Sequence, residues 1–212
     1  MPTHVQAFVV TTWLLAMLPG AGQALILRQT LTQGRRHAWT SIAGTASGIV
    51  VWSTLAAAGL SAVLLANPSA YLVVRVAGGL VLGYLGFSSL RAMRRQAQVA
   101  PAAPSEAPVE TESPTRRGAY LAGLATNLGN PKAGVFAVSI IPQFISPGGH
   151  FFASGVLLGL IWSTTTMGWY AVFVWVVERG RSVVSRPRVT TWLHGITGAV
   201  LMMLGAAVVV GI

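Results

Sequence analysis

Six long apolar segments constrain this chain more than any other feature of its sequence. They run over residues 7–32, 39–65, 70–90, 119–145, 151–177 and 189–210. A helix that crosses a bilayer needs about 20 apolar residues, and each segment reaches that length. Only 8% of the residues are charged, which is too few to cover a water-facing surface. Because the segments lack the alternation of β-barrel strands, they predict an all-α polytopic membrane protein with six transmembrane helices.

The loops between these segments differ sharply in their basic residues. Eleven of the 14 Lys and Arg residues follow the first, third and fifth segments: Arg35, Arg36, Arg91, Arg94, Arg95, Arg116, Arg117, Arg179, Arg181, Arg186 and Arg188. The other two loops, residues 67–69 and 146–150, have none. The positive-inside rule therefore places the basic loops in the cytoplasm and both termini outside it. The same distribution accounts for the net charge of +10 without a nucleic-acid partner.

Three motifs occur twice in the same order. The first copies are Pro19-Gly-Ala-Gly22, Gly44-x-x-x-Gly48 with Trp52-Ser-Thr54, and the segment Gly79 to Gly86. The second copies are Pro131-Lys-Ala-Gly134, Gly155-x-x-x-Gly159 with Trp162-Ser-Thr164, and the segment Gly198 to Gly205. Units of three spans enter the membrane from opposite sides, so we expect an inverted repeat, which is typical of alternating-access transporters. A duplicated bundle without a transport role, with the glycine pairs serving packing alone, is the structural alternative.

The repeat divides the chain into two three-helix halves, residues 1–95 and 116–212. Between them, residues 96–115 are rich in Ala and Pro and hold three of the four Glu residues. This composition predicts a flexible cytoplasmic linker.

Each half begins with an interrupted span. Pro19-Gly20 lies about midway along the first segment and Asn130-Pro131 lies correspondingly in the fourth. Proline removes a backbone donor and displaces the preceding turn, so we expect both helices to be broken or kinked there. Equivalent breaks in two halves indicate a substrate site, and the free amides of a half-helix N-terminus favour an anion. Ordinary packing kinks are the alternative.

Three polar side chains near the breaks complete the predicted substrate site, which comprises Pro19, Gly20, Gln23, Asn130, Pro131 and Lys132. A cation within a span is costly and indicates function, although Lys132 could instead extend to the membrane surface. The amides of Asn130 and Gln23 could bind a zwitterion or satisfy freed backbone groups. The sequence leaves both alternatives open.

Residues around the two breaks also match a known family. The matching residues are Leu18-Pro-Gly-Ala-Gly-Gln-Ala-Leu25, Arg28, Gly34-Arg-Arg36 and Gly44-x-x-x-Gly48 in the first half, and Asn130-Pro-Lys132, Phe136 and Pro142-Gln-Phe144 in the second. In these positions the chain resembles the LysE-type amino-acid exporters, which include homoserine and threonine efflux proteins. The resemblance covers everything except the linker. It implies an exporter driven by the proton-motive force in a bacterial inner membrane.

We therefore expect a secondary-active exporter of amino acids or similar small zwitterions, with the substrate and the lipid bilayer as its partners. Strongly cationic substrates are disfavoured, because the chain has no Asp and its four Glu residues lie outside the six segments. Cys is also absent, and we expect no catalytic residue, metal or cofactor. A passive channel is an alternative; an intramembrane enzyme is a weaker one, since no Gly-x-Ser-x-Gly motif occurs. The oligomeric state is open, with a homo-oligomer among the options.

Overall fold

The computed structural model describes three long stretches of the chain and a few single positions. These are residues 2, 4–66, 115–146 and 150–180, with positions 73, 76, 80, 83, 84, 87, 90, 91, 199, 202, 203 and 206. Most of the expected third and sixth spans, and the expected linker up to residue 114, lie outside the described residues.

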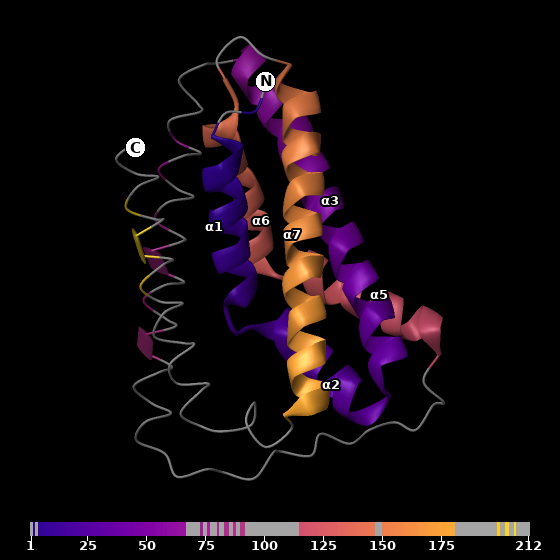
Figure 1. Ribbon diagram of the computed structural model, residues 1–212. Coiled ribbons are helices and arrows are strands. Elements are labelled where there is room, and N and C mark those ends of the chain that lie inside the picture. The colour runs from indigo at the N-terminus through magenta and orange to yellow at the C-terminus, as the bar shows by residue number, and fades with distance from the viewer. Residues whose placement is uncertain are drawn as a thin grey trace.

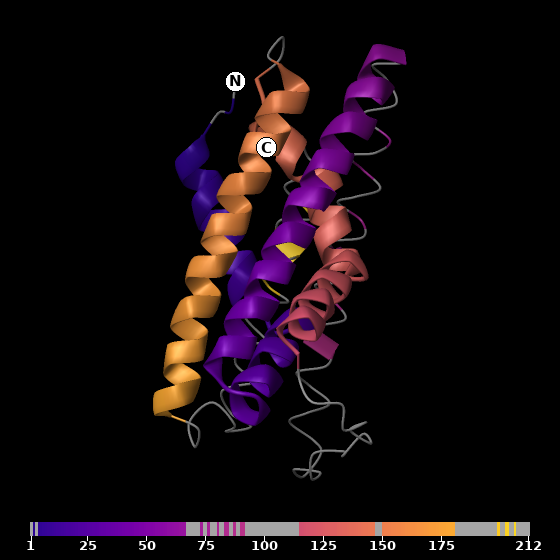
Figure 2. The same ribbon diagram turned by 90° about the vertical axis from the view of Figure 1, so that its right-hand side faces the viewer.

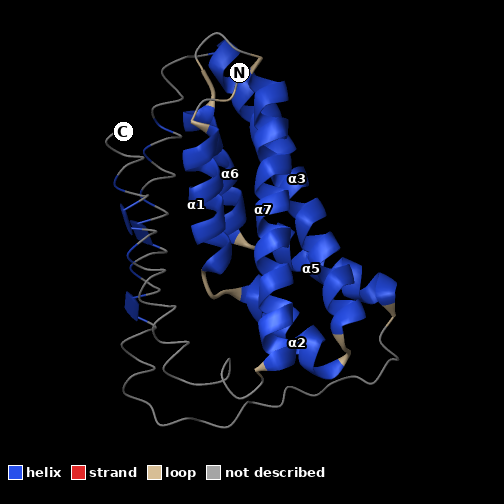
Figure 3. Cartoon of the chain, in the orientation of Figure 1, coloured by secondary structure: helices blue, strands red, loops and turns tan. Residues whose placement is uncertain are grey.

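Within the described stretches the chain is helical and has no strand (Figure 3). The helices are α1 (Val5–Met17), α2 (Ala21–Thr32), α3 (Arg35–Ala66), α5 (Arg116–Leu128), α6 (Pro131–Ser139), the 3-10 helix η1 (Ile141–Phe144) and α7 (Phe151–Arg179). Figure 1 shows α3 and α7 running the length of the bundle, with α1, α2 and α6 as shorter elements beside them. The expected all-α class is confirmed for this part of the chain.

In the part of the chain that the structure describes, two helices are long and apolar enough to cross a membrane. They are α3, over Arg35–Leu60, and α7. Helices α1 and α2 meet the same criteria as a pair, bent by 60° at their junction. The fourth expected span is divided among α5, α6 and η1. Both predicted breaks are therefore present, and the helices agree with a polytopic membrane protein.

Helix α3 packs closely against α5, and the two run in parallel (Figure 2). The Ser41 hydroxyl donates to the Ala119 carbonyl at 2.8 Å, and one turn further Thr45 donates to the Gly123 carbonyl at 3.4 Å. A Cβ atom added at Gly44 would collide with the Tyr120 carbonyl, and one at Gly123 would collide with the Ser41 carbonyl. The small residues thus let two backbones touch, which is the packing role expected as the alternative for Gly44.

The second glycine pair has the same role between α7 and α3. A Cβ atom at Gly155 would lie 2.6 Å from the Ala57 side chain. One at Gly159 would collide with the Ser53 side chain. Together the glycine pairs hold α5 and α7 against α3, which is therefore the central helix of the described bundle.

Two apolar clusters occupy successive levels along these long helices. The first contains Phe8, Ile49, Ala56, Leu60, Phe136, Ile141, Leu158 and Trp162. The second contains Ile26, Ala38, Ile42, Tyr170, Phe173, Val174 and Val177. On α3 the boundary falls between residues 42 and 49, and on α7 between residues 162 and 170. The helix breaks lie at this boundary, between two apolar layers.

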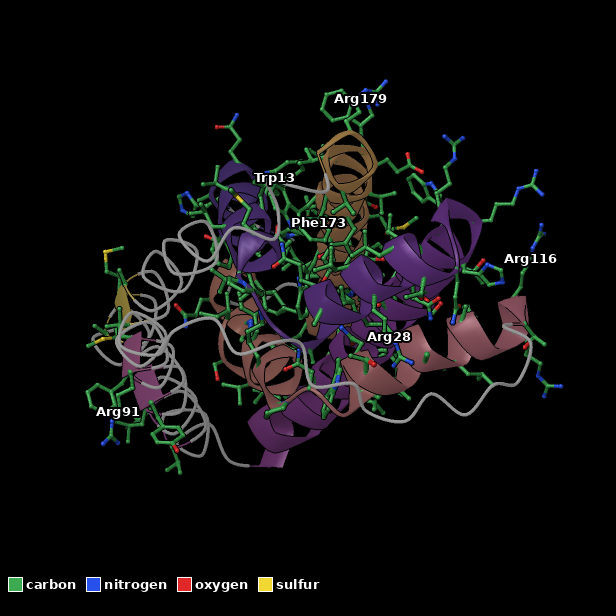
Figure 4. All side chains as sticks on the ribbon, turned by 90° about the horizontal axis from the view of Figure 1, so that it is seen from below. Trp13, Arg28, Arg91, Arg116, Phe173 and Arg179 are labelled. Carbon is green, nitrogen blue, oxygen red and sulfur yellow. The ribbon has the colours of Figure 1, made fainter. Side chains whose placement is uncertain are left out.

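The arginines gather at one end of the bundle, which we call the basic end. Helix α3 begins at Arg35, α7 ends at Arg179, and α5, parallel to α3, begins at Arg116. Figure 4 looks onto this end and shows Arg116 and Arg179 extending away from the helices. The Arg179 guanidinium stacks on the Trp175 ring, 4.4 Å from its centroid. The second apolar cluster adjoins this end and the first cluster adjoins the opposite end.

Candidate substrate site

The first break leaves a helix start without a side-chain cap. Helix α1 ends at Met17, and α2 begins at Ala21 after the partly buried Pro19. The N-cap residue is Gly20, in extended backbone, and it has no side chain that could accept from the first N–H groups of α2. These amides carry the positive end of the helix dipole and are available to an external acceptor.

The second break is closed by its own side chain. Asn130 is the N-cap of α6, and its Oδ1 accepts from the Lys132 backbone N–H at 3.1 Å. Pro131 takes the first helical position, where a missing N–H costs nothing. The Asn130 oxygen thus satisfies a freed backbone group, which is the structural alternative that the sequence left open.

Lys132 brings the two breaks together. Its Cα belongs to α6, but its ammonium lies beside the N-cap of α2, where a Cβ atom added at Gly20 would be 3.9 Å from Nζ. The side chain is partly buried and runs towards the N-terminus of its helix, as helical side chains do. It therefore adds a full positive charge to the uncapped start of α2.

Gln23 lies in the first turn of α2 with only 6% of its surface exposed. Neither Oε1 nor Nε2 has a hydrogen-bond partner among the described residues. A buried amide without partners costs about 1–3 kcal/mol, so it is an unusual feature of a packed bundle. Gln23 therefore does not satisfy freed backbone groups among the described residues.

Sequence reasoning missed one face of α7. Trp162, Thr166 and Tyr170 are four residues apart and form one buried stripe. The Trp162 ring packs on Phe136 of α6, with centroids 4.7 Å apart, whereas the Tyr170 hydroxyl would lie 2.7 Å from a Cβ at Gly22 of α2. Thr166 lies between these two contacts and so faces the region between α6 and α2. The helical spacing to the repeated Trp162 is the only signal that could have identified it.

Trp52 makes the corresponding contact in the other half. Its ring lies 3.0 Å from the position of a Cβ at Gly134 in α6, and its indole N–H donates to the Asn127 carbonyl at 3.3 Å. Each half-helix thus places a glycine against an aromatic residue of a long helix from the other half. The Gly134 contact lies two residues after Lys132 on α6. The Gly22 contact lies two residues after Gly20, the residue that Lys132 approaches, on α2.

The arrangement suits a solute that carries a carboxylate and further polar groups. It offers one ammonium, one uncapped helix start and a buried amide, enclosed by apolar layers that strengthen charge-assisted bonds. The only acidic residue among those described is Glu178, which is exposed near the end of α7. A substrate cation would therefore find neutral oxygen atoms here rather than a carboxylate.

Comparison with known proteins identifies a family and several related membrane proteins. The family model of the LysE type translocator matches residues 13–211. A threonine efflux protein of Escherichia coli is 26% identical over 195 residues, covering 92% of this chain and 91% of the relative. A homoserine/homoserine lactone efflux protein of Salmonella typhimurium is 27% identical over 200 residues, covering 94% and 93%. An uncharacterized membrane protein of Bacillus subtilis, YrhP, is 25% identical over 201 residues, covering 94% and 95%.

The comparison with solved structures finds no match. The family match spans both breaks, the linker and all six apolar segments, and the relatives are matched over nearly their whole length. The chain belongs to the LysE type translocator family.

Proposed function

We propose that this protein is a secondary-active exporter of amino acids or closely related small zwitterions, driven by the proton-motive force and working by alternating access. Relatives whose names state threonine efflux and homoserine efflux support the substrate class. The family relationship supports a transporter rather than an enzyme.

One observation carries this proposal: the Lys132 ammonium lies at the uncapped start of α2, between two apolar layers. A substrate carboxylate placed there accepts from the α2 amides and pairs with Lys132. Such bonds are about twice as strong as neutral ones. The site then consists of Gly20, Gln23 and Lys132, with Pro19, Asn130 and Pro131 forming the two backbone breaks that position them.

The alternating-access mechanism rests on the two halves. Residues 1–95 and 116–212 form, in this proposal, an inverted repeat of three spans each, joined by the linker 96–115. The opposite directions of α2 and α6 (Figure 1) support it, since both begin at the midplane and run to opposite ends. Movement of one half against the other then exposes the site to each side in turn.

The orientation follows from the basic end. Clustered arginines favour the cytoplasmic side, so the basic end faces the cytoplasm of a bacterial inner membrane and both chain termini face outwards. Single cysteines in this Cys-free chain test it: an impermeant thiol reagent should label position 147 but not position 181 in intact spheroplasts. The reverse labelling contradicts the orientation.

A passive channel is disfavoured by the apolar layers on both sides of the site. Buried residues of the first layer, such as Phe8 and Phe136, and of the second, such as Ile26 and Val177, have no exposed surface. A continuous polar path would have to pass through both layers at once, whereas an alternating carrier opens only one at a time.

The test uses inside-out vesicles and a panel of radiolabelled amino acids. An exporter accumulates its substrate inside such vesicles, and we expect accumulation that collapses when a protonophore removes the gradient. Vesicles containing an inactive variant provide the control. Downhill flux alone, unaffected by the gradient, supports the channel, and the absence of amino-acid transport contradicts the proposed function.

A further inference from the structure

Seven buried side-chain atoms among the described residues have no hydrogen-bond partner, and the proposed carboxylate contacts leave most of them unexplained. They are Gln23 Oε1 and Nε2, Gln29 Oε1, Asn127 Oδ1, Ser139 Oγ, Thr166 Oγ1 and Trp169 Nε1. Four of them have other surroundings: Gln29 is two turns along α2, Ser139 is the last residue of α6, the Trp169 ring packs on Trp13 of α1, and Asn127 lies against Gly48 in the α3–α5 contact. Gln23 and Thr166 remain: Gln23 lies three residues after Gly20, and Thr166 lies on the buried stripe of α7 between its contacts with α6 and α2.

The hydroxyl of Thr166 differs in its hydrogen bonding from the hydroxyls of its two neighbours on α7, Thr164 and Thr165. Thr164 donates to the Leu160 carbonyl at 2.8 Å, and Thr165 donates to the Trp162 carbonyl at 2.8 Å. A threonine inside a helix usually donates its hydroxyl hydrogen to a backbone carbonyl of the preceding turn. Thr166 makes no such bond although it is only 5% exposed. Its hydroxyl is therefore free for a group outside its own helix.

Gln23 and Thr166 face the same region from two helices. Gln23 follows Gly22, where an added Cβ atom would lie 2.7 Å from the Tyr170 hydroxyl, and Thr166 is one turn before Tyr170 on the same stripe. Ile26, three residues after Gln23, is fully buried in the cluster that contains Tyr170. Residues three apart share a helix face, so Gln23 also faces α7. Two buried side chains without partners thus face the contact between α2 and α7, which adjoins the helix start that Lys132 approaches.

We propose that Gln23 Oε1 and Thr166 Oγ1 form a second subsite that accepts hydrogen bonds from the α-ammonium of the substrate. This inference rests on the proposed function, since it concerns the same cavity and adds the group that distinguishes an amino acid from a simple carboxylic acid. An ammonium has three donors and no acceptor. Two neutral acceptors opposite Lys132 can bind it, whereas Lys132 repels it and orients the zwitterion with its carboxylate towards α2.

The absence of an acid in this subsite has a consequence for selectivity. A carboxylate in place of Gln23 would bind any cation strongly, including diamines. Neutral oxygens bind an ammonium more weakly than a carboxylate does, so tight binding here also needs a carboxylate of the same molecule that pairs with Lys132. The subsite therefore selects molecules that carry both charges close together, which is the α-amino acid arrangement.

The experiment compares an amino acid with the same molecule lacking its amino group. The best-exported amino acid of the panel serves as substrate, and its deaminated analogue serves as competitor; for L-threonine this analogue is 3-hydroxybutanoate. The variants are Thr166→Val, which keeps the shape and removes the hydroxyl, and Gln23→Leu. Thr164→Val is the matched control, because Thr164 is exposed on the same helix. Thr166→Ser keeps the hydroxyl and tests rescue.

We expect Thr166→Val and Gln23→Leu to raise the half-saturating amino-acid concentration about tenfold to a hundredfold, as for a lost hydrogen bond to a charged group. Inhibition by the deaminated analogue should be unchanged in both. Lys132→Met should weaken both ligands, and Thr166→Ser and Thr164→Val should resemble the parent protein.

Two outcomes overturn the inference while the proposed function stands. Unchanged amino-acid transport in both variants means that the subsite does not bind the substrate. Equal weakening of the amino acid and its analogue means that the residues act on the carboxylate or on packing. If the parent protein transports no amino acid at all, the proposed function itself fails, which separates the two results.

Discussion

The two helix breaks show how similar sequences produce different chemistry. Pro19-Gly-Ala-Gly22 and Pro131-Lys-Ala-Gly134 match at three of four positions. Yet α6 starts at its proline, with Asn130 as its cap, whereas α2 starts two residues after its proline, with the uncapped Gly20. The residue that differs in the motif is Gly20 in one half and Lys132 in the other, and these two residues meet.

Because of this difference, the two breaks would contribute complementary parts to the proposed substrate site. The first break supplies free backbone amides and space, since a glycine has no side chain to occupy it. The second break is capped by its own Asn130 side chain and supplies the Lys132 ammonium. In the proposed function, a site with both parts forms only where the two halves meet, as alternating access between the halves would need. Four predictions test this division.

The largest effect is expected from removing the charge of the second break. Lys132→Met should reduce export at least a hundredfold, because it removes the one cation at the α2 start while keeping much of the side-chain length. Insertion should be intact, since removing a charge from a membrane interior does not weaken the bundle. Transport in inside-out vesicles at matched abundance measures it, with Arg28→Met as the exposed control. Normal export by Lys132→Met would assign the anion site to backbone amides alone.

Capping the first break should have the next largest effect. Gly20→Asn introduces a side chain that can accept from the α2 amides, as Asn130 does in α6. The new Cβ atom has room, because its nearest neighbour is Lys132 Nζ at 3.9 Å. We expect a more stable protein whose half-saturating substrate concentration rises about tenfold, the effect of one lost hydrogen bond to a charged group. A rise in stability with unchanged transport would show that the α2 amides do not bind substrate.

The paired glycine contacts should respond differently to one added methyl group. Gly22→Ala places a Cβ atom 2.7 Å from the Tyr170 hydroxyl, and the next atom is 3.8 Å away. Gly134→Ala meets three ring atoms of Trp52 at 3.0–3.2 Å. Overpacking costs about 1–3 kcal/mol, so both variants should lose stability. Adding Tyr170→Phe should restore Gly22→Ala alone, as thermal unfolding in detergent can show. Failure of this rescue would mean that the hydroxyl is not the obstacle.

Uncapping the second break should have the smallest effect. Asn130→Ala removes the acceptor of the Lys132 N–H and should cost about 1 kcal/mol of stability. Substrate affinity should change little, because the amides concerned belong to α6 and not to the open helix start. Thermal unfolding together with transport assays separates the two quantities. A large loss of affinity at unchanged stability would show that Asn130 contacts the substrate.

Much of the fold was predictable because its causes are local. The length of the apolar segments predicts helices, and Pro19 and Pro131 predict the breaks, since a proline in a helix interior removes a backbone donor and displaces the preceding turn. The glycine pairs were open between packing and function. Gly44 has a packing role, because the Tyr120 carbonyl lies against it, and only the structure shows this contact. The predicted site residues stay a prediction, with geometry that now favours Gln23 and Lys132 over Pro131.

What the sequence determined by itself is therefore the membrane class, the family motifs and the position of each break, because hydropathy and backbone chemistry act within one segment. What only the tertiary structure decided is which groups are left unpaired and which meet. Thr166 and Thr165 are neighbours of identical chemistry, yet one bonds to its own helix and the other does not. Lys132 reaches Gly20, 112 positions earlier, because α6 and α2 start at the same level. Such facts depend on packing between distant segments, which no local pattern encodes.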